Sequence, residues 1–385
     1  MNDPLLRLRA EFPSLEDGCH LISHSLGAMP RGARTGLEQY ADEWSGRSVR
    51  AWEEGWWELP RTVGDELALL LGAAPGTVVL QPNATLAGAV FLSALDFDAP
   101  RDGLVTTSLD FPSLLYMYRG LADRGARLVE VPSEDGLTID TGRLLDAIDE
   151  RTRVVTISHV LFRSAFVMDV AAVAERAREV GAMVVLDLYQ SAGTLPLDLA
   201  GLGVDAAFGG CLKWLCGGPG NAYLYVRPDR IPELRPRLTG WQAHADPFAF
   251  DGESFRPTAG IERFLTGTPP VSALRAARAG IANVAAAGLA AIREKSTRQT
   301  TRILDRCDAE GWDVRSPREA ARRGGSFVLA PPDFQNVAAR LIERGILIDQ
   351  RPEAGIRIGP HFYNTDAEVD RALDAIAEIV AERSV

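Results

Sequence analysis

The sequence predicts an α/β fold, with a mostly parallel seven-stranded sheet in a large domain and a small α+β domain at the carboxyl end. Two observations support this prediction. Short apolar runs alternate with amphipathic helical stretches from about residue 60 to 230, and strands buried in a parallel sheet have this near-continuous apolar character. Beyond residue 270 the pattern changes to Ala-rich helical sequence followed by a few short strands. We therefore expect helices on both faces of the large sheet.

The expected strands of the large domain are short apolar runs, and lie at 77–80, 103–107, 127–131, 154–158, 183–186, 206–208 and 222–226. Amphipathic segments separate them, and these predict helices at 61–71, 86–95, 116–124, 141–148 and 170–180.

A long helix is expected to run from Val271 towards Asp305, because this stretch contains few helix breakers, and a smaller α+β unit is expected to follow it. Strands are expected at 326–329 and 346–349. A Thr-Asp-Ala-Glu sequence starting at Thr365 is a capping-box pattern, and it predicts a last helix that continues to about Glu382. The predicted domains are 26–274 and 275–385, with residues 1–25 packing against the second.

The composition narrows the class of protein. The chain has 385 residues, is 46% hydrophobic and carries a net charge of −11. An acidic surface disfavours nucleic acid and anionic membranes as partners. The first residues lack a basic region followed by an apolar run, and no apolar stretch is long enough to span a membrane. The four cysteines have no metal-ligand spacing. We expect a cytoplasmic protein without a metal.

Lys213 and Asp187 are the most informative residues of the sequence. Asp187 ends the apolar run Met183–Leu186, and Lys213 lies in a loop that continues Gly217-Gly218-Pro219-Gly220. An acid at the end of a buried strand and a lysine in a small-residue loop suit pyridoxal phosphate (PLP). The lysine holds the cofactor as a Schiff base, and the acid keeps the pyridine nitrogen protonated. Taken alone, each residue also fits a solvated loop or a helix cap.

Four further segments fit around this pair. Ala84 and Thr85 open a helix after a strand, where free N–H groups bind phosphate; an ordinary N-cap has the same sequence. Phe111 follows another strand and is suited to stack on a pyridine ring, although a Phe-Pro turn is often structural. Arg357 lies among alternating apolar residues and offers a fork for a substrate carboxylate. Thr268 lies in a turn before the long helix, where it either contacts a phosphate or caps the helix.

The chain resembles the fold-type I PLP enzymes of the class V aminotransferase group, and within it kynureninase, over nearly its whole length. The motif residues are His24-Ser25-Leu26-Gly27, the Trp-rich stretch 52–57, Phe111-Pro112-Ser113, His159-Val160, Gly240-Trp241 with His244, and the segment Gly260–Pro270. The last is the most specific, since it nearly repeats the family's Gly-Ile-x-Arg-Phe-x-x-Gly-Thr-Pro-Pro.

This resemblance implies roles for individual residues. Lys213 would be the Schiff-base lysine and Asp187 the pyridinium partner, with Phe111 stacked on the ring. Other residues would hold the cofactor or its phosphate: Ala84, Thr85, Gln190, Trp241 and Thr268. Arg357 would bind the carboxylate of a small amino-acid substrate, with His24, Ser25, Leu114 and Leu212 nearby. Part of the phosphate site comes from the neighbouring subunit in such enzymes, which implies a homodimer with shared active sites.

Three positions depart from the kynureninase pattern. Leu114 stands where the family has an acid, Gln190 where it has a histidine, and Leu212 where it has a tyrosine. Hydrolysis of a carbon–carbon bond needs positioned proton-transfer groups, each worth about 10²–10⁴-fold in rate. Desulfurases of this group use a nucleophilic cysteine shortly before the carboxylate-binding arginine. No cysteine lies between Asp308 and Arg357, which disfavours desulfurase chemistry.

We therefore expect lyase-type cleavage or elimination at the β-carbon of an amino acid, for example by a C–S lyase of an antibiotic pathway. The alternatives are an aminotransferase, an oxidative decarboxylating deaminase and a kynureninase-type hydrolase.

Overall fold

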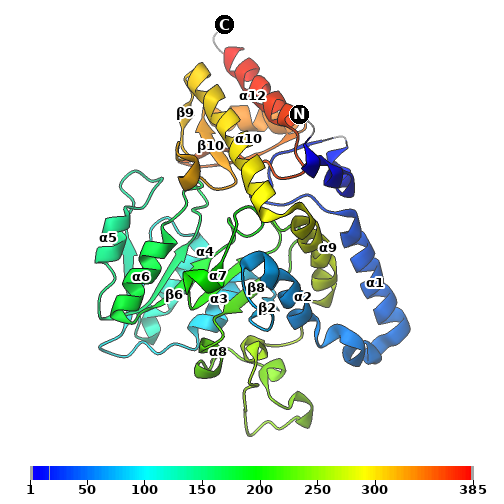
Figure 1. Ribbon diagram of the computed structural model, residues 1–385, viewed down its shortest axis with the longest axis vertical. Helices are drawn as coiled ribbons and strands as arrows, with labels where there is room; N and C mark the ends of the chain where they lie inside the picture. Colours follow the sequence, from blue (N-terminus) through cyan, green and yellow to red (C-terminus); the bar gives the residue numbers. More distant parts are fainter. Residues whose placement is uncertain (1–2, 17, 383–385) are drawn as a thin grey trace.

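The core of the protein is a seven-stranded sheet in the order β2-β8-β7-β6-β5-β3-β4 (Figure 1). The computed structural model describes residues 3–16 and 18–382; the outermost parts of the predicted terminal ranges, 1–2 and 383–385, lie outside the described residues. The strands are β2 Val78–Gln81, β3 Gly103–Thr107, β4 Arg127–Val131, β5 Thr152–Ser158, β6 Met183–Asp187, β7 Ala206–Gly210 and β8 Ala222–Val226.

The sheet is mostly parallel, as predicted. β4, β3, β5, β6 and β7 run in one direction, whereas β8 is antiparallel to both β7 and β2. The carboxyl ends of β5 and β6 therefore meet at one edge of the sheet, where ligands bind in open α/β sheets.

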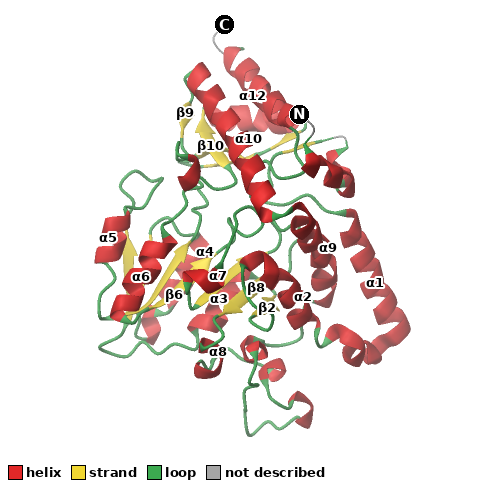
Figure 2. Cartoon of the chain, in the orientation of Figure 1, coloured by secondary structure: helices red, strands yellow, loops and turns green. Residues whose placement is uncertain are grey.

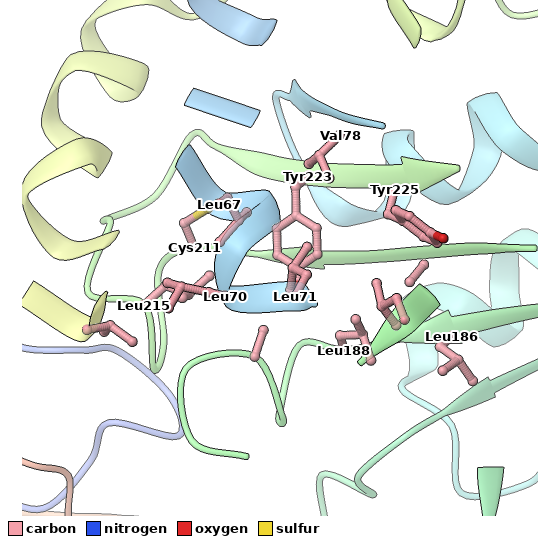
Figure 3. Packing of buried hydrophobic residues seen from close by; sticks show 14 of the residues in the cluster. Leu67, Leu70, Leu71, Val78, Leu186, Leu188, Cys211, Leu215, Tyr223 and Tyr225 are labelled. Carbon is pink, nitrogen blue, oxygen red and sulfur yellow. The ribbon is translucent and has the colours of Figure 1, made fainter. Parts of the chain in front are cut away.

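Helices cover both faces of the sheet, as Figure 2 shows. Alternate residues of one strand enter different clusters: Val184 and Leu186 pack into one and Val185 into the other. Figure 3 shows the first cluster, where Leu67 and Leu71 lie near Tyr223 of β8. The helices of the large domain are α1 Arg31–Arg47, α2 Leu59–Ala68, α3 Ala84–Leu92, α4 Pro112–Gly120, α5 Thr141–Asp146, α6 Val170–Val180, α7 Leu199–Leu202 and α8 Arg230–Glu233.

The long helix expected after residue 270 is two helices, so that prediction is wrong. α9 Val271–Ala287 and α10 Leu289–Glu310 meet at Gly288, whose φ of +79° favours glycine. Leu274 and Ile281 of α9 belong to the same cluster as the large sheet, whereas Ile303 of α10 packs in the small domain. The boundary at residue 274 stays a prediction.

The small domain has a four-stranded sheet in the order β12-β13-β10-β9. The strand expected at 346–349 is divided between β11, which pairs with β1 near the start of the chain, and β12. The remaining elements are β1 Cys19–His20, β9 Asp313–Val314, β10 Phe327–Ala330, α11 Phe334–Glu343, β11 Ile346–Leu347, β12 Asp349–Arg351, β13 Gly355–Ile358 and α12 Asp366–Ala381. Of the helices that the structure describes, none is long and apolar enough to cross a bilayer.

The capping box predicted at Thr365 is present. Its hydroxyl oxygen accepts from the Glu368 N–H at 3.1 Å, and the Glu368 carboxylate accepts from the Thr365 N–H at 2.7 Å. We expect Thr365→Ala to lower the free energy of unfolding by about 1 kcal/mol, because it leaves a helix N–H without its cap. Urea unfolding of the apoprotein measures this. Ser45→Ala on the exposed side of α1 is the control, and an equal loss in both variants would contradict the capping role.

Candidate active site

A cavity of about 240 Å³ lies where β5, β6 and the starts of α3 and α4 meet. It brings together eight residues singled out from the sequence: Ala84, Thr85, Phe111, Leu114, Asp187, Gln190, Leu212 and Lys213. These residues are up to 129 positions apart in the chain, between 84 and 213, so only folding assembles them. Apolar and aromatic side chains form much of the cavity wall, among them Leu114, Val160 and Leu212.

Asp187 is the last residue of β6 and is buried. One carboxylate oxygen accepts from the Tyr189 N–H at 2.8 Å, and the other has a long contact of 3.4 Å with the Ser158 hydroxyl. Burial raises the pKa of Asp187, and the nearby charge of Asp110 adds to this, while Lys213 opposes it. The second oxygen therefore has capacity for a cationic N–H in the cavity.

Lys213 lies in the loop that follows β7. Its Nζ lies 5.8 Å from the Phe111 ring centroid and 4.2 Å from that of Tyr189. Burial lowers the pKa of Lys213, as do Arg357 and Arg351, whereas Asp187 raises it. A lowered pKa makes the neutral, nucleophilic amine more accessible.

Lys213 has one competitor for an aldehyde-bearing cofactor. Lys213 and Lys295 are the two lysines of the sequence. Lys295 is buried, and its Nζ bonds to the Asp3 carboxylate at 2.8 Å and the Phe362 carbonyl at 2.7 Å. Lys213 is therefore the lysine available for a covalent cofactor.

The amino end of α3 lies at one end of the cavity. Asn83 is the N-cap, and its side chain accepts from the Leu86 N–H at 2.9 Å. The N–H groups of Ala84 and Thr85 belong to the first turn, where an α-helix offers donors without an intrahelical partner. Both residues line the cavity. The ordinary cap expected from the sequence is therefore present, and the phosphate-binding role of Ala84 and Thr85 stays a prediction.

Asp110 holds the two sides of the cavity in place. One carboxylate oxygen accepts from the Thr106 hydroxyl and from the Thr107 hydroxyl and N–H at 2.8 to 3.0 Å. The other accepts from the Ser158 N–H at 2.6 Å. Asp110 thereby fixes Phe111 relative to the end of β5.

We expect Asp110→Ala to lower the free energy of unfolding by about 3–5 kcal/mol, because it leaves several buried donors unpaired. We also expect weaker cofactor binding, since Phe111 loses its anchor. Chemical unfolding and cofactor titration measure the two effects. Asp123→Ala, at an exposed position after α4, is the control and should change stability by less than about 0.5 kcal/mol. Equal stability of the two variants would contradict the bracing role.

Arg357 does not line the cavity. It is buried on β13 and forms a two-point ion pair with Asp349, its register partner on β12, at 2.7 and 2.5 Å. Its third bond, of 2.8 Å, goes to the carbonyl of Phe162, a cavity residue. The carboxylate-binding role of Arg357 stays a prediction.

Four other predicted residues also lie outside this cavity. His24 Nε2 contacts Asp349 at 2.9 Å, and burial lowers the pKa of His24 to about 4. His24 is thus neutral and donates from Nε2. Ser25 follows His24 in the chain.

Trp241 and Thr268 lie in another part of the chain. Trp241 packs on Trp57 with ring centroids 4.8 Å apart, and Thr268 is exposed. Within one chain these residues do not reach the cofactor cavity.

One residue of the cavity and one beside it were not anticipated. Tyr189 lines the cavity beside Lys213, and Asp349 occupies the guanidinium fork of Arg357. A signal existed for Asp349, because the turn-forming Pro352 and Gly355 between it and Arg357 indicate a hairpin.

The side chain of Gln190 forms two hydrogen bonds that the sequence did not predict. Its amide donates to the His24 carbonyl and accepts from the Trp214 indole, both at 3.0 Å. This anchors Gln190 at the cavity wall and links the cavity to the N-terminal segment.

Comparison with known proteins identifies the family. The model of the family described as aminotransferase class-V matches residues 46–372. The chain belongs to this family. Kynureninase of Pseudomonas fluorescens is 33% identical to this class-V chain, over 99% of the chain and 94% of the relative. Kynureninase of Burkholderia pseudomallei strain K96243 is 33% identical, over 98% and 93%.

Solved structures support the same fold. A cysteine desulfurase from Thermococcus onnurineus NA1 superposes with a TM-score of 0.87 at 21% identity, and 99% of both chains is covered. The cystine C–S lyase C-DES in complex with cysteine persulfide gives a TM-score of 0.85 at 21% identity, with 95% of this chain and 99% of that chain covered.

The class-V enzyme uses pyridoxal phosphate, and the cavity fits this cofactor. Lys213 is the available amine, Asp187 has an oxygen to accept from a pyridinium N–H, and the start of α3 offers donors to a phosphate. Phe111 presents an aromatic face beside them. When bound, the cofactor would supply an electron sink for the substrate α-carbon.

Proposed function

We propose that this class-V enzyme cleaves or eliminates a substituent at the β-carbon of an amino acid, in specialised metabolism such as antibiotic biosynthesis. The proposal rests on which side chains line the cavity. Among its lining residues, the titratable side chains are Asp187, Tyr189 and Lys213. Burial raises the pKa of Tyr189 well above its ordinary value, so its phenol stays neutral. With Asp187 assigned to the pyridine nitrogen, Lys213 is the group suited to move a proton near neutral pH.

Elimination needs one such group. Lys213 takes the α-proton, and the β-substituent leaves with its bonding electron pair. One water then converts the remaining unsaturated amino acid to a 2-oxo acid and ammonium. The apolar wall at Leu114, Leu212 and Phe162 limits water near the β-carbon.

Hydrolysis of a kynurenine-like substrate is less well supported, although the curated relatives are named kynureninase. Leucines occupy positions 114 and 212, where that reaction places an acid and a phenol. Persulfide chemistry is also less well supported. All four cysteines are buried, and burial raises the pKa of Cys211 and of Cys216 to about 12.

A panel of amino acids, followed by cofactor spectrum and product analysis, tests the proposal. Release of a 2-oxo acid and ammonium without an added keto acid is the expected result. Accumulation of an amine form of the cofactor that a keto acid reverses would identify an aminotransferase. Oxygen consumption with carbon dioxide release would identify the oxidative decarboxylating route, and anthranilate release from kynurenine the hydrolase. Each of these three would overturn the elimination.

We also propose a homodimer in which the partner subunit completes the phosphate end of each cavity. Trp241 and Thr268, expected near the phosphate, lie outside their own chain's cavity. Trp241 adjoins exposed aromatic rings of Phe248 and Phe250, a surface typical of an interface. Mixing Lys213→Ala chains with Trp241→Ala/Thr268→Ala chains should restore activity in mixed dimers. No recovery, with mixing shown by mass, would contradict shared sites.

A further inference from the structure

Tyr189 places an aromatic face against the amine of Lys213. The Nζ of Lys213 lies 4.2 Å from the Tyr189 ring centroid and 5.8 Å from that of Phe111. An ammonium within about 6 Å of a ring centroid is attracted by the ring quadrupole, and more strongly where water is excluded. Tyr189 is the closer of the two rings, and it is part of the cavity wall.

Contacts at the backbone and at the hydroxyl end of Tyr189 fix the position of its ring. Its backbone N–H donates to the Asp187 carboxylate at 2.8 Å. Its hydroxyl lies against the backbone of Gly210 on the neighbouring strand β7, where an added Cβ would be 2.2 Å from the phenol oxygen and 2.3 Å from Cζ. Gly210 therefore makes room for the ring. The hydroxyl points towards β7, so the ring face is the part that meets Lys213.

The charged groups around Lys213 have opposite effects on its pKa. Asp187 of β6 and Asp349 of β12 favour the charged amine, whereas Arg357 of β13 and Arg351 of β12 disfavour it. Burial also disfavours the ammonium and is the largest cause of the lowered pKa of Lys213. A neutral ring face adds attraction to the ammonium without adding a formal charge that would compete for the pyridinium partner.

We propose that Tyr189 is a positioning residue for Lys213: its ring face holds the charged amine in the cavity after that amine is released from the cofactor. The role belongs to the ring and not to the hydroxyl. The inference rests on the proposed function, in which Lys213 leaves the cofactor and carries the α-proton.

Amine labelling of the full-length, cofactor-stripped protein tests this without turnover. Acetic anhydride is applied at a series of pH values, and modification of the Lys213 peptide is measured by mass spectrometry against the buried Lys295. Leucine is shorter than tyrosine but apolar, so Tyr189→Leu removes the ring while keeping this part of the cavity wall hydrophobic. We expect it to move the labelling midpoint of Lys213 down by about half to one pH unit, since the charged form loses its support. Tyr189→Phe should leave the midpoint within about 0.2 units of wild type, because the ring face is kept.

Gly210→Ala provides an independent test, because its methyl group would displace the ring while Tyr189 itself is kept. It should lower the midpoint in the wild-type background and add nothing to Tyr189→Leu. Circular dichroism checks folding, and should Gly210→Ala fail to fold, the Leu and Phe variants decide.

Two results would overturn the inference. A shift in Tyr189→Phe as large as in Tyr189→Leu would assign the role to the hydroxyl. An unchanged midpoint in Tyr189→Leu would show that the ring does not act on the amine. Because no substrate is used, either result is distinct from failure of the elimination, which product analysis alone decides.

Discussion

Lys213→Ala is expected to abolish covalent attachment of the cofactor and to lower turnover by roughly 10³-fold or more. The variant loses both the amine that binds the cofactor and the group that moves the α-proton, and one positioned proton-transfer group alone is worth about 10²–10⁴-fold. Borohydride reduction followed by peptide mass spectrometry measures the attachment. In the wild type the added mass should lie on the Lys213 peptide, and in the variant no lysine peptide should gain it.

Lys295→Arg is the matched control for this experiment. It changes the other lysine of the chain but keeps a cation beside the Asp3 carboxylate and the Phe362 carbonyl. We expect the reduced cofactor to remain on Lys213 in this variant. Borohydride-reducible cofactor that persisted in Lys213→Ala would contradict the assignment of Lys213.

Asp187→Asn is expected to lower turnover by about 10²–10³-fold. A buried carboxylate beside the pyridine nitrogen raises the pKa of that nitrogen, and each unit is worth about 1.4 kcal/mol. The amide keeps the shape and can still accept from the Tyr189 N–H, but it carries no charge to support a pyridinium. Steady-state kinetics and the pH dependence of the cofactor spectrum measure the loss. Ser158→Ala, which removes the 3.4 Å contact to Asp187, should lower turnover only slightly.

The same substitution is expected to stabilise the apoprotein. Burial raises the folded-state pKa of Asp187 to about 6, so the stability associated with its protonated form is lost as the pH rises through that folded pKa. The amide that replaces the carboxyl group cannot ionise and avoids this loss. We expect the apo variant to melt higher than wild type at pH 7, with the difference shrinking as the pH falls towards about 4, the ordinary pKa of an aspartate. A lower melting temperature at pH 7 would contradict the electrostatic cause.

The sheet and the central pair were predictable because they follow from local sequence. Apolar runs between helical stretches indicated the strands, and Asp187 ends one of them. The N-cap at the start of α3 was predictable for the same reason. Gly288 was a missed signal, because a single glycine in Ala-rich sequence can continue a helix or end it.

The contacts of Tyr189 and Arg357 were harder to predict, because each depends on a second strand. Tyr189, in the turn after β6, faces Lys213 because Gly210 leaves space on β7, and no periodicity in the sequence of β7 reveals that match. For Arg357 the sequence suggested an external carboxylate and gave no notice of the Asp349 carboxylate, its register partner across the hairpin. The register between two strands decides which side chains pair across them. The sequence around one residue does not specify this register.

The presence of two lysines in 385 residues has a consequence for stoichiometry. With Lys295 buried in an internal ion pair, each chain offers one side-chain amine to an aldehyde. Cofactor fixed by reduction therefore counts active sites directly, without correction for adventitious adducts on surface lysines. A preparation that incorporates less than one equivalent per chain contains a matching fraction of incompetent sites, so rates can be normalised to working enzyme from a single mass spectrum.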